Sequence, residues 1–90
     1  MSGPPDELDA RDCALVDFER EWSAHRGAKD TAIRQRFGVS PARYYQLLAR
    51  VIDLAAAEVY DPLTVRRLRR RRHERARRRA ARELGERTSR

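Results

Sequence analysis

Residues 28–53 read AKDTAIRQRFGVSPARYYQLLARVID, and this order of residue types predicts two helices joined by a tight turn. Gly38 suits the end of the first helix, because glycine takes a positive φ without steric cost. Ser40 can cap the second helix with its hydroxyl, and Pro41 fits the first helical turn, where no N–H is needed. The apolar residues spaced to hold the two helices together are Ile33, Phe37, Val39, Tyr44, Leu47 and Leu48. This is the layout of a helix-turn-helix, whose second helix can enter the major groove of DNA.

The second helix of the pair is expected to run from Pro41 to about Leu54 with one apolar and one polar side. Its inward residues are Tyr44, Leu47, Leu48, Val51 and Ile52. On the outward side, arginine can fork to guanine, glutamine can pair with adenine, and tyrosine can contact a phosphate or a sugar. The candidate DNA-contacting residues are therefore Ser40, Ala42, Arg43, Tyr45, Gln46 and Arg50. An ordinary solvated helix face is the alternative interpretation.

A first helix is expected to begin after Asp9 or Asp12, to end near Ser23 or Ala24, and to brace the pair from behind. Its apolar stripe consists of Cys13 or Ala14, Leu15, Phe18 and Trp22, with Trp22 as a core anchor. Its charged, exposed face consists of Asp17, Glu19, Arg20 and Glu21. Residues 25–27 are expected to form a loop in which His25 is solvated. The next helix, from Ala28 to Phe37, should turn Ala32, Ile33 and Phe37 inward and Lys29, Arg34 and Arg36 outward.

The C-terminal third of the chain predicts one long basic helix. Residues 55–60 either extend the preceding helix or form a short connector. Asp61 and Pro62 then mark a new helix start, and strong helix formers follow as far as Leu84, with Gly85 as the stop. Such a helix would be about 34 Å long at 1.5 Å per residue. Leu63, Val65 and Leu68 are expected to dock on the domain, and a thin apolar stripe continues with Ala76, Ala80 and Leu84.

Charge is distributed very unevenly along the chain. Residues 62–90 carry 13 arginines and three glutamates, a net charge of +10, whereas residues 1–61 carry 8 basic and 11 acidic residues, a net charge of −3. Such a segment is typical of binding to a polyanion, with nucleic acid as the first candidate. The expected phosphate-binding residues are Arg66, Arg67, Arg69, Arg70, Arg71, Arg72, Arg75, Arg77, Arg78, Arg79 and Arg82.

These elements predict an all-α chain, in which a three-helix helix-turn-helix core precedes a long arginine-rich C-terminal helix. The expected divisions are a disordered N-terminus (1–8), the helix-turn-helix domain (9–60), the basic helix (61–85) and a disordered tail (86–90). Cys13 is the single cysteine, so no intrachain disulfide and no cysteine-based metal site is expected. No apolar run is long enough for a membrane span, and the N-terminus lacks the features of a signal peptide.

Several stretches together carry a resemblance to a known family. They are DFEREW (17–22), GAK (27–29), AIRQRFGVS (32–40), RYYQLL (43–48), DPL (61–63) and VRRL (65–68). In these stretches the chain resembles a family of small, basic, uncharacterised actinobacterial proteins, over roughly residues 8–85. The resemblance implies a helical architecture and brings no biochemical activity. The segment around the turn is also similar in layout to the DNA-reading helices of sigma factors and small regulators.

The first functional hypothesis is a DNA-binding regulator or nucleoid-associated protein of the cytoplasm, with residues 41–53 in the major groove and the basic helix on phosphates. A homodimer on two half-sites fits this hypothesis. The alternative is an accessory protein of RNA polymerase or of the ribosome, whose basic tail binds RNA. No arrangement of catalytic residues and no phosphate-binding loop is evident, so we expect no enzyme, no cofactor, no metal and no small-molecule substrate.

Overall fold

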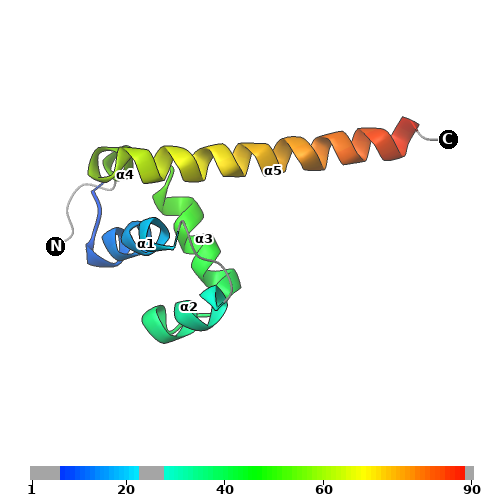
Figure 1. Ribbon diagram of the computed structural model, residues 1–90. Coiled ribbons are helices and arrows are strands. Elements are labelled where there is room, and N and C mark those ends of the chain that lie inside the picture. Colours follow the sequence, from blue (N-terminus) through cyan, green and yellow to red (C-terminus); the bar gives the residue numbers. More distant parts are fainter. Residues whose placement is uncertain (1–6, 23–27, 89–90) are drawn as a thin grey trace.

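The computed structural model describes residues 7–22 and 28–88, with side chains as far as residue 86, and this part of the chain is all-α. Its helices are α1 (Ala10–Glu21), α2 (Lys29–Phe37), α3 (Pro41–Val51), α4 (Ala55–Tyr60) and α5 (Pro62–Thr88). In Figure 1, α5 lies along one side of the other helices, and its C-terminal half extends well beyond them. The predicted fold class and the long terminal helix are confirmed.

The turn between α2 and α3 has the predicted local chemistry. Gly38 has φ 68° and ψ 24°, the left-handed conformation that ends α2, and its N–H donates to the Arg34 carbonyl at 2.9 Å. Ser40 caps α3, since its Oγ accepts from the Arg43 N–H at 3.1 Å, and Pro41 occupies the first turn. Each residue therefore satisfies a backbone requirement that the neighbouring helix end imposes.

Helix α1 begins with two reciprocal caps. The Asp12 N–H donates to Asp9 Oδ1 at 2.8 Å, and the Asp9 N–H donates to Asp12 Oδ2 at 3.3 Å. Asp9 is thus the N-cap, which decides between the two predicted starts. The helix ends at Glu21, two residues before the earlier predicted end. The loop prediction for residues 25–27, including His25, lies outside the described residues, as do residues 1–6 and 89–90.

Aromatic side chains join α1, α2 and α3 into one core. The Phe18 ring lies 5.7 Å from Trp22, 5.5 Å from Phe37 and 5.6 Å from Tyr44, measured between ring centroids. Tyr44 is fully buried, and Trp22 packs against the core as an anchor, as predicted. The other buried apolar residues are Leu15, Val16, Ile33, Leu47, Leu48, Val51, Ile52, Ala57, Val65 and Leu68. Leu8, predicted to lie in the disordered terminus, also packs against this core.

The segment before α5 forms a short helix of its own, α4, rather than an extension of α3. Asp61 then caps α5, since its Oδ1 accepts from the Thr64 N–H at 3.2 Å, and Pro62 starts the helix as predicted. Val65 and Leu68 dock as expected, but Leu63 is 78% exposed, so its predicted inward position is wrong. Leu63 precedes Val65 by two residues, which places it about 200° around the helix from the packed side.

The second half of α5 extends beyond the packed part of the molecule. Every described side chain from Arg75 to Glu86 is exposed, including the thin stripe of Ala76, Ala80 and Leu84. Gly85 does not end the helix, contrary to prediction, because α5 continues to Thr88. Gly38 is the described glycine with a positive φ, and at Gly85 the neighbouring helix formers keep the backbone helical.

Candidate nucleic-acid interface

The outward side of α3 is as the sequence predicts. The exposed residues are Ala42, Arg43, Tyr45, Gln46, Ala49 and Arg50. Arg43 and Gln46 lie next to each other, with Nη1 of the arginine 3.4 Å from Oε1 of the glutamine. Ser40 is exposed but uses its hydroxyl to cap the helix. An exposed, largely polar surface of more than two helical turns is therefore available on α3.

The arginines of α5 divide into two groups, and the first group has partners within the molecule. Arg69 donates through Nε to the Ile52 carbonyl at 2.6 Å and through Nη1 to Glu58, which also accepts from Arg66 Nε at 3.1 Å. The hydrogen bonds from Arg66 and Arg69 lower the pKa of the Glu58 carboxyl. These contacts fasten α5 to α4 and to the end of α3.

Two further arginines of this group fix α5 to α3 and α1. Arg72 Nη2 lies 2.7 Å from Asp53 Oδ1, and this hydrogen bond lowers the pKa of the Asp53 carboxyl. Arg67 Nη2 donates to the Glu19 carbonyl at 3.1 Å. The sequence predicts all of these arginines to bind phosphate. In the structure, Arg66, Arg67, Arg69 and Arg72 instead have partners within the molecule.

The second group lies along the arm, as we call residues 73–88 of α5, and at its base. In the part of the chain that the structure describes, these side chains form no ion pair: Arg70, Arg71, Arg75, Arg77, Arg78, Arg79 and Arg82. Four of them, Arg75, Arg78, Arg79 and Arg82, line one shallow hollow and thus share a side of the helix. Because Arg75 follows buried Leu68 by seven residues, this side continues the packed side of α5 beyond the core.

We call Arg71, Arg75, Arg78, Arg79 and Arg82 the arginine face. Their helical spacing places all five within a quarter-turn of the direction in which Leu68 points. By the same spacing, Arg70 and Arg77 lie on the opposite side of α5. The arm therefore presents its densest positive charge on the side of α5 on which α3 lies in Figure 1.

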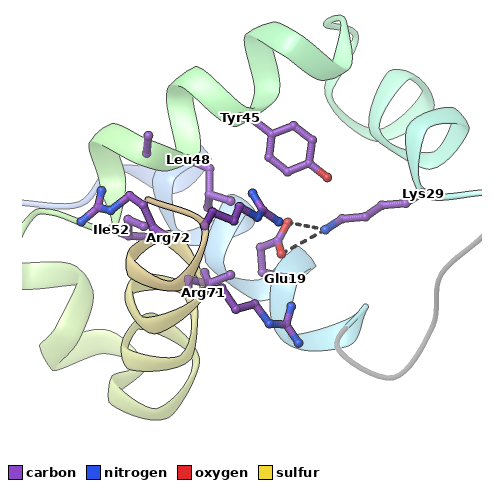
Figure 2. A pocket seen from close by; sticks show the side chains of 10 residues that line it. Glu19, Lys29, Tyr45, Leu48, Ile52, Arg71 and Arg72 are labelled. Carbon is purple, nitrogen blue, oxygen red and sulfur yellow. Dashed lines mark hydrogen bonds and ion pairs between the residues drawn. The ribbon is translucent and has the colours of Figure 1, made fainter. Parts of the chain in front are cut away.

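A buried ionic cluster that the sequence did not reveal supports α3 from behind. Glu19 is only 3% exposed, its Oε2 lies 3.0 Å from Lys29 Nζ, and it accepts a hydrogen bond from the Tyr44 hydroxyl. Figure 2 shows Lys29 reaching Glu19 from α2. Burial and the adjacent Glu19 carboxylate raise the pKa of Tyr44, so this phenol stays protonated. The predictions of an exposed Glu19 and an outward Lys29 are wrong, because the two charges neutralise each other at the helix junction.

The spacing of α1 contained a signal for this burial. Glu19 follows Leu15 by four residues and precedes Trp22 by three, so it lies on the apolar stripe of the helix. A carboxylate in such a position needs a cation or a hydrogen-bond donor from another element. Lys29 and Tyr44 supply both.

A small hollow, the corner pocket, lies where α3 meets the base of the arm. It encloses about 150 Å³ and has an apolar floor of Leu48, Ile52 and Leu68. Lys29, Tyr45, Arg71 and Arg75 are among the residues at its rim, and Figure 2 shows the Tyr45 ring and Lys29 projecting into the same space. The Lys29 ammonium lies 5.4 Å from the centroid of that ring. The pocket thus joins the outward side of α3 to the arginine face.

Other kinds of site are not evident in the described residues. Among residues 7–22 and 28–88, no group of three or more histidine, cysteine or acidic side chains is placed to hold a metal ion. The described helices include none that is both long and apolar enough to cross a membrane.

A family model described as "Protein of unknown function (DUF3263)" matches residues 7–80 of the chain. The chain belongs to the DUF3263 family. The DUF3263 match spans α1 to α4 and α5 as far as Ala80, so it includes the α2–α3 pair and most of the arginine face. No curated protein and no solved structure matches the chain. The expected membership of an uncharacterised family is confirmed, and the family description assigns no activity.

Proposed function

We propose that this chain binds double-stranded DNA, with the outward side of α3 in the major groove and the arginine face of α5 on the phosphates. In this proposal α2, the turn at Gly38 and α3 act as a helix-turn-helix, and the protein is a transcriptional regulator or a nucleoid-associated factor. The observation that carries the proposal is the arginine face, a row of unpaired guanidinium groups that begins beside α3.

The position of this charge favours nucleic acid over an inert surface. Opposite charges three or four residues apart on an exposed helix pair with one another and stabilise it, whereas like charges at this spacing destabilise it. Here the packed side passes from Leu68 to Arg75 and Arg79, and neither Glu74 nor Glu83 forms an ion pair with these arginines in the part of the chain that the structure describes. Phosphates are the partners that would relieve this repulsion, since bound arginines release counterions from the duplex.

Exposure and chemistry on α3 suit base contact in the same complex. Arg43 and Gln46 are exposed on consecutive turns, and their side chains can recognise guanine and adenine edges in the major groove. The buried side of α3 is fixed by Tyr44 and Leu47 in the core, so the outward residues project from a rigid support. Arg50 continues this exposed surface by one turn.

The contribution of the arginine face can be separated from that of net charge by matched double variants. Arg75→Gln/Arg79→Gln removes two charges from the arginine face, and Arg70→Gln/Arg77→Gln removes two from the opposite side of the same helix. Fluorescence anisotropy with a random-sequence duplex across a salt series measures the slope of log affinity against log salt for each variant. We expect the first pair to lose about 1.8 of slope, at about 0.9 per phosphate contact, and the second pair to keep the parent slope.

Equal losses of salt slope in the two double variants would show that the arginines contribute to binding irrespective of their side of the helix. That result would refute the role of the arginine face. A full chain that fails to bind any duplex would refute DNA binding altogether. Base recognition is tested by Gln46→Ala, which should reduce discrimination between genomic and random duplexes while keeping the salt slope. If Gln46→Ala weakens binding to all duplexes by the same factor, Gln46 does not contribute to sequence recognition by α3.

The alternative function, an accessory protein of RNA polymerase or the ribosome, loses part of its expected contact surface. In this alternative the acidic residues Asp17, Glu19 and Glu21 of α1 would contact the partner protein. Glu19 is buried, however, and Asp17 accepts from Tyr60 at 2.7 Å and pairs with Arg20 at 3.2 Å. A structured RNA in the same anisotropy series, together with co-sedimentation with ribosomes, tests this alternative. Tighter binding to RNA than to duplex DNA at equal salt would favour it.

A further inference from the structure

We infer that the corner pocket holds one sugar–phosphate unit of the bound DNA strand, so that this strand passes between α3 and the base of the arm. The inference rests on the proposed DNA binding and adds a defined contact to it. If the inference holds, the arginine face contacts the phosphates of the strand that borders the groove occupied by α3. It does not contact phosphates beside a more distant groove.

The size of the pocket limits its ligand to a single small group. Its volume is about 150 Å³, which is below the roughly 300–1,000 Å³ of sites that enclose small-molecule ligands. Tyr45 and Ala49 of α3 line the pocket and are themselves exposed, so a group that enters it can remain part of a longer chain. A backbone unit of a polymer meets both conditions.

The charges around the pocket favour an anion. Lys29 is neutralised by Glu19, and Arg72 by Asp53, whereas Arg71 and Arg75 have no ion-pair partner among the described residues. Glu19 is the acidic residue in the lining, and its carboxylate is already held by Lys29 and by the Tyr44 hydroxyl. Two guanidinium groups without an ion-pair partner among the described residues therefore line the pocket, and such groups can bind phosphate oxygens through charge-assisted hydrogen bonds.

The apolar floor indicates that the anion carries an apolar neighbour. Leu48, Ile52 and Leu68 form the floor, and the Tyr45 ring, 39% exposed, forms one wall. A free inorganic phosphate would leave these surfaces unused. A deoxyribose has carbon-bound hydrogens that can lie against such a floor, while its phosphate reaches the arginines at the rim, and tyrosine contacts with sugars are common in protein–DNA complexes.

Disulfide cross-linking tests the location of the strand in the full-length chain. Ala49→Cys places a thiol at the pocket, and Ala81→Cys places one on the arm beside Glu74 and Arg77, away from the pocket. Both substitutions are made in a Cys13→Ser background, and the duplex carries thiol tethers on its backbone phosphates. We expect Ala49→Cys to cross-link at least tenfold faster than Ala81→Cys.

Single arginine variants give a second, independent measurement. Arg71→Gln should reduce the salt slope by about one, whereas Arg70→Gln, its neighbour outside the pocket, should leave the slope unchanged. Two results would overturn the inference about the pocket: equal cross-linking at both cysteines, or equal salt slopes for Arg71→Gln and Arg70→Gln. If the parent chain still binds the duplex with a steep salt dependence, the proposed DNA binding stands. Absence of duplex binding by the parent chain would overturn both.

Discussion

Replacing Tyr44 with phenylalanine tests whether the buried ionic cluster stabilises the fold. The substitution keeps an aromatic ring where Tyr44 lies 5.6 Å from Phe18 and 5.4 Å from Phe37, so the packing of the core changes little. It removes the hydroxyl that donates to Glu19, a side chain with only 4% of its surface exposed. The carboxylate then has Lys29 as its remaining side-chain partner.

The expected cost follows from the loss of a hydrogen bond to a buried charge. Such bonds contribute about 1.5–3 kcal/mol, and a buried acceptor that loses its donor has no water to replace it. We therefore expect Tyr44→Phe to lower the free energy of unfolding by about 2 kcal/mol. That amount is a large fraction of the stability of a small domain, which is about 5–15 kcal/mol.

Urea unfolding followed by the fluorescence of Trp22 measures this loss, because Trp22 packs against the core and not on the arm. The slope of free energy against urea should not change, since the surface exposed on unfolding is the same. Tyr45→Phe is the matched control, because Tyr45 is 39% exposed, and its cost should stay within about 0.5 kcal/mol. A Tyr44→Phe loss equal to that of the control would refute a stabilising role for the cluster.

Other predictions concern the turn, a titration and the docking of α5. Gly38→Ala should cost about 1 kcal/mol in urea unfolding: the added Cβ meets no atom within 4 Å, so only the φ of 68° is strained, and a loss above about 3 kcal/mol would contradict this. The hydrogen bond to Asp17 raises the pKa of Tyr60 to about 12, so phenolate absorbance should report that value, and Asp17→Asn should bring it towards 10. This bond stabilises the fold below pH 10, and the stabilisation is lost as pH rises through 12. Leu68→Ala should cost about 2–4 kcal/mol and Leu63→Ala under about 0.5 kcal/mol, and similar losses would place Leu63 in the core.

Features fixed by neighbouring residues were predictable from the sequence. Gly38, Ser40 and Pro41 end one helix and start the next through contacts within a few residues, and Asp61 with Pro62 does the same for α5. The exposed side of α3 was also predictable, because helical spacing alone separates it from the buried side. Local backbone chemistry and periodicity therefore determined most of the helix pattern.

Features that depend on partners far along the chain were not predictable in the same way. Glu19 is buried because Lys29 and Tyr44 reach it from other helices, and its spacing gave the only local indication. Arg69 binds the Ile52 carbonyl and Glu58. Helical spacing places Arg69 nearer than Arg70 to the packed side of α5, but it does not identify these partners. Which arginines remain available for a ligand is thus decided by tertiary contacts.

The continuity of α5 from its docked turns into the arm gives the arginine face an angular phase. Each residue of an α-helix turns the chain by about 100°, so one residue inserted after Arg72 would rotate Arg75, Arg78, Arg79 and Arg82 by about 100° relative to Arg71 and the docked turns, without changing the charge of the arm. Seven inserted residues would make nearly two full turns and return the face to its original bearing, displaced by about 10 Å along the axis. The length of the arm therefore sets how far its arginines extend from the core. The number of residues between the docked turns and each arginine sets the direction in which that arginine points.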